Sequence, residues 1–384
     1  MKSHNHNTVF ILGAGFGVDA GLPLIDNFLE RLRDAIPWLE GQDRAAEAAA
    51  ISKVLDFRLK AAAAASVVDL DLESVEELFS LASASEPGDR SDYVRLAIAA
   101  TLDYCRSCHA HQERAVLGFH AASDGPSGVA WEEVEKPATG NVNCNAYFKV
   151  PLYGYYASVL SGLLTEQRKN SSSTVITLNY DTLVEEGLAS AGIKPIYGFG
   201  AKTFADKRTV LAAEPHECIP VLKLHGSVNW AFPGTRGGRL TVYDDYSHLR
   251  RELPDGVPIL LPPTWNKILI DPVNVVWQRA VKALSVATRI VVVGFSIPPT
   301  DAHFKYLLAA GLRENISIRQ ILFVNPDKAT IQPRVERMFP NAHFRRRAIR
   351  FIDVGTREFF TDLTSLKESH LQLGPKCVLC YVVQ

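Results

Sequence analysis

The segment that most constrains the fold runs from Thr8 to Phe28 (TVFILGAGFGVDAGLPLIDNF). Its apolar start, Val9 to Leu12, is typical of a strand buried in a parallel sheet. Glycines at 13, 15 and 17 follow at once, and glycines in that place let the backbone approach a pyrophosphate at the start of a helix. Gly21-Leu22-Pro23 then ends this helix early. A glycine-rich turn alone is a weak signal, so its meaning depends on the later motifs.

Three later apolar strands end in polar residues: Thr174 to Asp181 (TVITLNYD), Val221 to Ser227 (VLKLHGS) and Arg289 to Asp301 (RIVVVGFSIPPTD). In an open parallel sheet, ligands bind at the carboxyl edge of the strands. The ends of these strands are therefore expected to meet the glycine turn in one crevice, which would bring together Gly13, Asn179, His225 and Ser296.

Taken together, these motifs resemble the sirtuin superfamily, with GAGFGxxxGLP, TLNYD, KLHGS and GFS as the matching segments and Asn325 at an adenosine-ribose position. The resemblance covers residues 8–35 and 147–330. It is nearest to sirtuin-like domains of bacterial anti-phage systems, which share three further features: Pro-Pro-Thr-Trp (262–265), a Trp that opens a helix (Trp277), and Asp-x-His (Asp301, His303). It implies an α/β fold, a Rossmann-like parallel sheet with helices on both faces plus a helical insertion.

The resemblance also implies that NAD+ is bound as a substrate. The residues it implies for nucleotide binding lie in the glycine turn and after two later strands: Gly13, Ala14, Gly15, Phe16, Gly21, Leu22, Pro23, Gly294, Ser296 and Asn325. Those it implies for catalysis are Asn179, His225 and Asp181.

Residue chemistry agrees with these roles. Cleavage between nicotinamide and ribose passes through an oxocarbenium-like transition state, so an enzyme must hold the ribose, orient the leaving group and place a proton acceptor near the nucleophile. His225 can serve as the acceptor for a proton from a ribose hydroxyl or from water, because imidazole titrates near neutrality. Asn179 can position water or a ribose hydroxyl without adding charge, and Asp181 can accept a hydrogen bond from the nicotinamide carboxamide. Ser296 and the Gly294 backbone would take phosphate or ribose hydroxyls.

One departure from the family bears on the reaction. Protein-deacylating sirtuins carry a zinc ribbon between the His-Gly and Gly-x-Ser strands, whereas this chain has no cysteine between His225 and Gly294. Pro23-Leu24-Ile25-Asp26 also replaces the usual Pro-Asp-Phe-Arg. Without the zinc module the acyl-lysine cleft lacks one wall, so water is the default nucleophile and no zinc is expected.

The leading hypothesis is therefore an NAD+ glycohydrolase that acts by NAD+ depletion as the effector of an anti-phage defence system. Two alternatives stay open: a non-catalytic subunit that binds NAD+ or ADP-ribose, and a zinc-free protein deacylase or ADP-ribosyltransferase. Relatives of this size are paired with a HerA-type ATPase, so a homo-oligomer that docks on such a ring is implied. Too few residues follow Pro326 for an appended sensor domain, so restraint is expected from assembly or a partner.

Each candidate residue also has a purely structural interpretation. Asn179 or Asp181 would cap the helix that begins near Thr182. His225 would be a buried histidine bonded to a carbonyl, and Ser296 a turn residue. The order of the motifs along the chain favours a shared nucleotide site over four separate structural roles.

The strand–helix alternation is interrupted by one central stretch. The expected division is a Rossmann-like domain of residues 1–37 and 147–384 and a helical insertion of residues 38–146, which is the expected partner surface. Helices are expected over Arg44–Ser66, Glu73–Ala84, Asp92–His120 and Tyr147–Leu164. Non-helical segments are expected as a loop over Ser123–Asn145, a hairpin or loop over Thr235–Pro254, and a terminal strand over residues 377–383.

Composition excludes several classes. The 384 residues carry a net charge of −1, which gives no general field for nucleic acid or a membrane. No apolar run approaches the ~20 residues of a membrane span, and the start MKSHNHN is not a secretory signal. Six scattered cysteines indicate a reducing cytoplasm.

Two short cysteine pairs invite a zinc interpretation. Cys105, Cys108, His109 and His111 form one cluster, and Cys377 and Cys380 form another. One straight helix cannot place four ligands around a tetrahedral ion, so no metal site is expected. The basic tract Phe344–Arg347 is expected at a solvated helix-to-strand junction or partner surface rather than at a phosphate.

Overall fold

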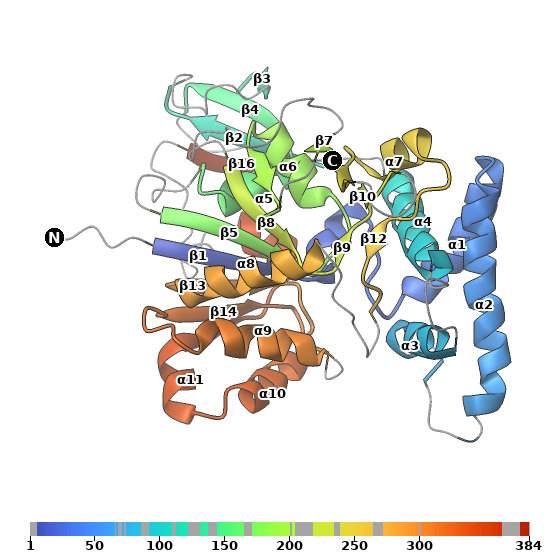
Figure 1. Ribbon diagram of the computed structural model, residues 1–384. Coiled ribbons are helices and arrows are strands. Elements are labelled where there is room, and N and C mark those ends of the chain that lie inside the picture. The colour runs from blue at the N-terminus through green and yellow to red at the C-terminus, as the bar shows by residue number, and fades with distance from the viewer. Residues whose placement is uncertain are drawn as a thin grey trace.

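Figure 1 shows a computed structural model of the protein. The structure describes residues 6–65, 67, 71–72, 74–85, 92–109, 113–121, 131–136, 144–164, 171–199, 202–203, 218–233, 239–263, 272–298, 301–362 and 377–383.

The centre of the molecule is a seven-stranded parallel sheet. Its strands, in spatial order, are β15 (Ile349–Ile352), β14 (Gln320–Val324), β13 (Arg289–Val293), β1 (His6–Leu12), β5 (Ser171–Thr177), β8 (Cys218–Lys223) and β6 (Lys194–Ile196). The chain runs outward from β1 through β5 to β8, then returns to β13 on the other side of β1. The run from β8 to β15 has the 3-2-1-4-5-6 order of doubly wound dinucleotide-binding folds, and it confirms the predicted fold class.

Both faces of the sheet are covered by helices (Figure 1). Along β1, Phe10 and Leu12 pack toward α5 (Leu152–Leu160), α6 (Leu183–Ser190) and α12 (Thr356–Thr361). Val9 and Ile11 pack toward α8 (Val273–Ser285), α9 (Ala302–Leu312) and α10 (Lys328–Met338). Burial on both faces explains why the central strands are continuous apolar runs.

A second sheet lies over the α5 side. Its antiparallel order is β16 (Cys377–Val383), β2 (Arg114–Phe119), β4 (Ala146–Pro151) and β3 (Glu132–Val134). The predicted terminal strand is confirmed as β16. The helix predictions over 92–120 and 147–164 are wrong in part, because 114–119 and 146–151 are strands. β2 is buried at five of its six positions, so it lacks the polar alternation that marks a strand in sequence.

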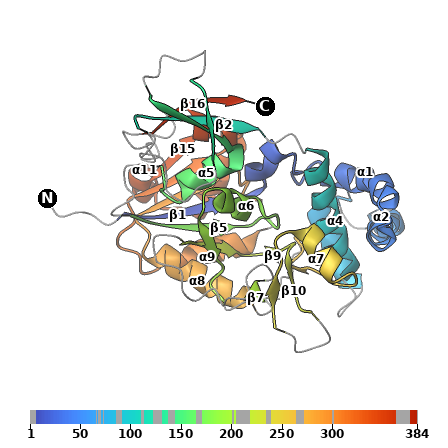
Figure 2. The same cartoon turned by 90° about the horizontal axis from the view of Figure 1, so that it is seen from above.

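A layer of helices covers the carboxyl edge of the main sheet (Figure 2). It contains α1 (Phe28–Gly41), α2 (Ala45–Ala65), α3 (Val75–Ser85), α4 (Asp92–Cys108) and α7 (Tyr246–Glu252). α2 and α3 agree with their predicted ranges. The apolar core of this layer includes Ala20 and Leu22 of the glycine turn, Leu183 of α6 and Val228. The layer therefore packs directly on the loops that follow β1, β5 and β8. α1 crosses residue 37, and the division into two domains stays a prediction.

The remaining elements in the described residues are short. They are η1 (Ala14–Ala20), β7 (Lys202–Thr203), β9 (Gly226–Ser227), β10 (Trp230–Ala231), β11 (Thr241–Val242), β12 (Ile259–Leu260) and α11 (Ala342–Ala348). β11 lies within the range 235–254 that is expected to form a hairpin or loop, but its antiparallel partner β10 lies before that range. α7 also lies within the range, so the expectation of a non-helical segment is wrong there. Of the loop expected over 123–145, the structure describes 131–136 and 144–145; the prediction is wrong at β3, which is a strand, and the rest lies outside the described residues.

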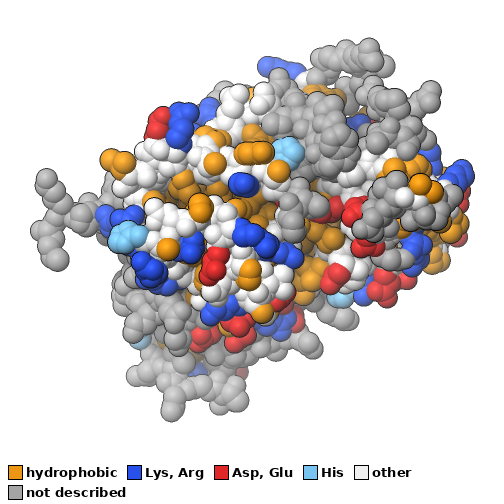
Figure 3. All heavy atoms as spheres, turned by 90° about the horizontal axis from the view of Figure 1, so that it is seen from below, with side chains coloured by type: hydrophobic (Ala, Val, Ile, Leu, Met, Phe, Trp, Pro, Cys, Tyr) orange, Lys and Arg blue, Asp and Glu red, His pale blue; other side chains and the backbone are white. Residues whose placement is uncertain are grey.

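None of the helices in the described ranges has the length and apolarity that a membrane span needs. The face seen from below carries basic and acidic side chains interspersed rather than one patch of a single sign (Figure 3). This mixture fits the net charge of −1.

Candidate active site

The polar strand ends lie side by side along the carboxyl edge. In spatial order they are Asn325 after β14, Gly294 after β13, Gly13 after β1, Asn179 after β5 and His225 after β8. β1 and β13 flank the point where the winding reverses, which is where doubly wound folds bind ligands.

The glycine turn packs backbone to backbone on the loop after β13. Gly13 N–H donates to the Val293 carbonyl at 3.0 Å, and Gly15 N–H donates to the Gly294 carbonyl at 2.8 Å. A Cβ on Gly15 would lie 2.8 Å from Gly294 Cα, and Gly294 itself has a φ of 63°. Glycine is required at 15 and 294 because the backbones of these two segments approach each other this closely.

Side chains beneath the turn hold it in place. The Phe16 ring is fully buried against Tyr153, and the Tyr153 hydroxyl donates to the Phe16 carbonyl at 2.8 Å. The Thr356 hydroxyl donates to the Gly15 carbonyl, also at 2.8 Å. Leu22 and Pro23 are buried as well. Because these side chains are buried, only the backbone of Phe16, Leu22 and Pro23 is left for contact with a nucleotide. Ala14 and Gly21, in the same turn, are half-buried.

Asn179 joins the end of β5 to the glycine turn. Its side-chain Nδ2 donates to the Gly13 carbonyl at 2.9 Å, and its backbone N–H donates to Thr177 Oγ1 at 3.1 Å. α6 begins later, at Leu183 with Thr182 as its N-cap residue, so Asn179 does not occupy the cap position. Asn179 therefore binds the glycine turn instead of capping α6.

His225 is buried, with 6% of its surface exposed. Its Nδ1 lies 3.0 Å from the carbonyl oxygen of Leu178. A carbonyl can only accept a hydrogen bond, so Nδ1 carries a proton, and Nε2 is the nitrogen that can accept one whenever the ring is neutral. The structural interpretation of His225 is thus correct and compatible with a role as base, since the same bond fixes the tautomer and the orientation of the ring.

The backbone around His225 is pinned by three contacts. Trp277 Nε1 donates to the Leu224 carbonyl at 2.8 Å, which gives the Trp of the sequence motif a physical role. Leu261 N–H donates to the His225 carbonyl at 2.8 Å. Gly226 has a φ of 79°, and a Cβ there would lie 2.0 Å from the Ile259 carbonyl, so the residue after His225 must be glycine.

Asp181 is held in a desolvated place. Its Oδ1 accepts from the Leu183 N–H at 3.0 Å, as the helix-cap interpretation predicts. Burial raises the pKa of Asp181, while the charge of Lys223 and the Leu183 N–H act in the opposite direction. The Asp181 carboxyl is therefore easier to protonate than an ordinary aspartate.

Lys223 is a residue that the motif analysis did not single out. It is fully buried at the end of β8, and its Nζ donates to the Asp181 carbonyl and, at 2.9 Å, to Glu185 Oε1. The signal was present in the sequence, because a lysine inside the apolar strand VLKLHG must be buried and paired.

The loop after β13 has an unusual backbone. Ile297 has a φ of 49°, which is a rare conformation for a β-branched residue. Ser296 before it is exposed, and its carbonyl accepts from Arg334 Nη1 at 2.6 Å. Asn325 Nδ2 donates to the Phe295 carbonyl at 3.3 Å and its Oδ1 accepts from the Asp327 N–H at 2.8 Å. Asn325 thus shapes this loop, and Ser296 lies at the surface.

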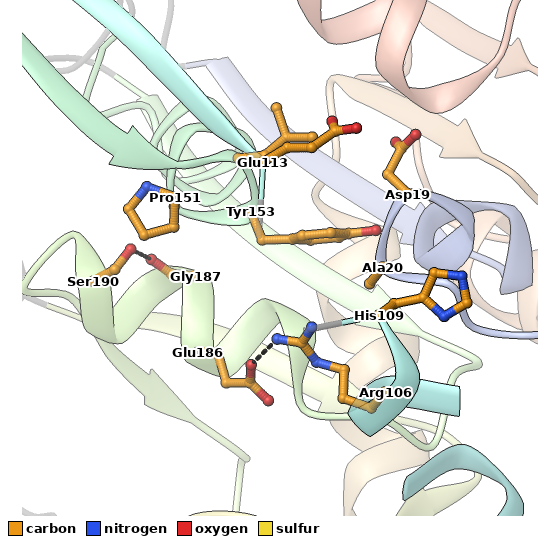
Figure 4. A pocket seen from close by; sticks show the side chains of 12 residues that line it. Asp19, Ala20, Arg106, His109, Glu113, Pro151, Tyr153, Glu186, Gly187 and Ser190 are labelled. Atoms are coloured by element: carbon orange, nitrogen blue, oxygen red, sulfur yellow. Dashed lines mark hydrogen bonds and ion pairs between the residues drawn. The ribbon is translucent and has the colours of Figure 1, made fainter. Parts of the chain in front are cut away.

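A cavity of about 240 Å³ lies beside the glycine turn (Figure 4). Its walls come from η1, α4, β4, α5 and α6, and the Tyr153 ring extends across it toward Asp19 (Figure 4). Arg106 Nη2 donates to Glu186 Oε2 at 2.7 Å, and Arg357 binds both Asp19 and Glu113. Arg106 and Glu186 thus pair within the lining, and Asp19 and Glu113 pair with Arg357 of α12 outside it.

The described residues contain no group of three or more His, Cys, Asp or Glu side chains that could hold a metal. Burial raises the pKa of the Cys105 thiol to about 12, while Cys108 is exposed. His111 and the motif residues 264 and 265 lie outside the described residues, as do the side chains at 377 and 380. The basic tract 344–347 lies in α11, directly before β15, as expected for a helix-to-strand junction.

The fold and the strand-end residues define a doubly wound α/β protein with a glycine turn at its ligand-binding edge. Within it, residues 173–345, which run from β5 into α11, match the model of the SIR2-like domain. β1 and the glycine turn precede the matched range and complete the same sheet.

Solved structures and curated proteins were also compared. A Sir2 homologue mutant in complex with 2′-O-acetyl ADP-ribose is 13% identical, covers 95% of this chain and 93% of its own, and has a TM-score of 0.42. A Sir2 bound to an acetylated peptide is 12% identical, covers 95% of this chain and 94% of its own, and has a TM-score of 0.40. No curated protein matches the sequence.

Proposed function

We propose that the protein is an NAD+ glycohydrolase, which converts NAD+ and water to ADP-ribose and nicotinamide. One arrangement carries the proposal. His225 Nδ1 is hydrogen-bonded to the carbonyl of Leu178. Asn179, the residue after Leu178, donates a hydrogen bond from its side chain to the Gly13 carbonyl. A histidine of fixed tautomer, a neutral amide and a glycine turn thus meet at the dinucleotide-binding edge of a SIR2-like domain.

The roles follow from this arrangement. The pyrophosphate lies on the backbone of the glycine turn, and Asn179 positions the nicotinamide ribose and the attacking water. The Asp181 carboxylate accepts a hydrogen bond from the carboxamide of the leaving group. As the C1′–N bond breaks, its electron pair goes to the nicotinamide nitrogen, which becomes neutral. The water oxygen bonds to C1′, and its proton passes to His225 Nε2.

The reaction is tested by incubating purified protein with NAD+, with and without an acylated peptide, and separating the products by chromatography. Free ADP-ribose and nicotinamide in equal amounts without peptide support the hydrolase. ADP-ribose that carries the acyl group, formed only with peptide, would overturn it in favour of a deacylase. Binding of NAD+ without any product would overturn it in favour of a non-catalytic subunit.

We further propose that this activity serves anti-phage defence by NAD+ depletion. An enzyme that destroys NAD+ is toxic to its own cell, so its activity must be restrained until infection. We propose that restraint comes from self-assembly and from a HerA-type ATPase subunit. Expression of the chain with and without its genomic neighbour, with NAD+ measured during phage infection, tests this role. NAD+ that stays constant through infection would contradict it.

A further inference from the structure

A buried ion pair lies directly behind the proposed catalytic residues. The Lys223 side chain is 0% exposed and that of Glu185 is 9% exposed, and their charged atoms are 2.9 Å apart. Two buried charges must pair closely, because each loses its contact with water. The cost of that loss can exceed the gain from pairing, so a gain in stability does not by itself explain a buried ion pair. Its position in the site therefore calls for a functional explanation.

Lys223 connects the two segments that carry the proposed catalytic residues. It ends β8 two residues before His225, and its Nζ donates to the Asp181 carbonyl. Glu185 lies in the first turn of α6, which begins just after Asp181. One ammonium group thus fixes the end of β8, the Asp181 peptide and the start of α6 relative to one another.

The same ammonium group acts on the Asp181 side chain. Burial disfavours the charged carboxylate, Glu185 and Glu186 on α6 disfavour it further, and Lys223 on β8 opposes them. Tyr153 on α5, which lines the cavity, is close enough to Asp181 for their charges to interact. The balance between Lys223 and the two glutamates sets how readily Asp181 keeps its charge.

We propose that Lys223 is a positioning residue for NAD+ cleavage. It aligns the Asp181 loop with His225 and keeps the Asp181 carboxylate charged, so that this carboxylate accepts a hydrogen bond from the leaving carboxamide. This inference rests on the proposed function of the site. Glu185, the ion-pair partner of Lys223, has the opposite effect on Asp181, because its negative charge disfavours the Asp181 carboxylate.

The test compares Lys223→Met and Glu185→Gln, two changes that each remove one partner of the pair and keep its length. Both should lower the melting temperature. Lys223→Met should reduce kcat about 10- to 100-fold with a smaller change in KM, as misplacement of a reacting group does. Its pH profile should lose activity on the acid side at a higher pH than wild type. Glu185→Gln should shift the same limb to lower pH.

Two further variants complete the design. Lys223→Met combined with Glu185→Gln leaves no unpaired buried charge, so it should recover the melting temperature but not kcat. Glu47→Gln is the matched control, because Glu47 is buried and paired with Arg44 and Arg250 in the helical layer. It should lower the melting temperature and leave kcat and the pH profile unchanged.

The outcomes separate this inference from the proposed function. Acid limbs that do not move in opposite directions, or a double variant with wild-type kcat, would overturn the role of Lys223. A wild-type protein that binds NAD+ without consuming it would overturn the hydrolase only, and the pH dependence of NAD+ affinity in the same variants would then decide the role of Lys223. A wild-type protein that does not bind NAD+ overturns both.

Discussion

The backbones of Gly15 and Gly294 touch: the N–H of Gly15 donates to the carbonyl of Gly294 at 2.8 Å, and neither residue has room for a Cβ. This contact joins the turn after β1 to the loop after β13 at the point where the winding of the sheet reverses. Sequence alone predicts that a side chain at 15 would fill the space of a pyrophosphate. The structure instead directs that side chain into Gly294.

Gly15→Ala should therefore weaken both folding and nucleotide binding. Forcing the two loops apart should cost about 1–3 kcal/mol of unfolding free energy, as overpacking does, and the displaced turn should bind ADP-ribose more weakly. Urea unfolding and titration calorimetry measure the two effects. Gly355→Ala is the control, because nothing lies within 4 Å of a Cβ at 355. Wild-type stability in Gly15→Ala would show that the contact is not tight in solution.

Asn179→Ala and His225→Ala should each abolish most NAD+ turnover. Loss of a positioned base or of the group that orients the nucleophile typically costs ~10²–10⁴-fold in rate. His343→Ala removes an exposed histidine of α11 and should keep wild-type activity. Circular dichroism confirms that each variant is folded. Near wild-type turnover in either of the first two variants would remove that residue from the mechanism.

Asp181→Asn should change the acid side of the pH profile. Burial raises the pKa of Asp181, so the wild-type carboxylate is lost, and activity falls, at a pH above the ordinary aspartate range. An amide does not titrate there, so the variant should lack this limb. A raised pKa in the folded state also means a contribution to stability that is lost as pH rises through that pKa. The stability of the variant relative to wild type should therefore increase as the pH rises through that pKa. An unchanged limb would show that another group titrates.

The protein should hold no stoichiometric zinc through Cys105 and Cys108. Zinc requires thiolates, whereas burial raises the pKa of Cys105 to about 12. Incubation with a chelator should leave melting temperature and NAD+ turnover unchanged, and in the native protein a thiol reagent should react with the exposed Cys108 but not with Cys105. One equivalent of zinc in metal analysis, lost together with stability on chelation, would contradict this expectation.

Sequence predicts the site best where a local pattern and the sheet act together. Each polar motif follows directly after a buried parallel strand, so the fold alone brings Gly13, Asn179 and His225 to one edge. The hydrogen-bond partners of these residues, however, belong to segments that are distant in the sequence. The bond from Asn179 to Gly13 spans 166 positions and the bond from His225 to Leu178 spans 47. No local pattern contains such partners.

The failures have the same physical origin. β2 is a strand because it pairs with β4 and with β16, which lies at the other end of the chain. Its sequence RAVLGF, buried at nearly every position, has no period that separates a strand from the end of a helix. Lys223 went unassigned because its partners, Glu185 and the Asp181 carbonyl, become neighbours only when β5 and β8 pair.

The helical layer offers a test of the proposed assembly. Leu59 on α2 is 70% exposed, and an apolar side chain of this size gains most when a partner covers it. Leu59→Asp should weaken self-association or co-purification with the ATPase partner. NAD+ turnover by the isolated chain should stay unchanged, because α2 supplies none of the strand-end residues. Ile316→Asp, at a residue that is 99% exposed between α9 and β14, is the matched control and should affect neither. Light scattering measures the oligomer and affinity co-purification measures the complex. An effect of Ile316→Asp without one of Leu59→Asp would move the contact surface from the helical layer to the α9 side of the sheet.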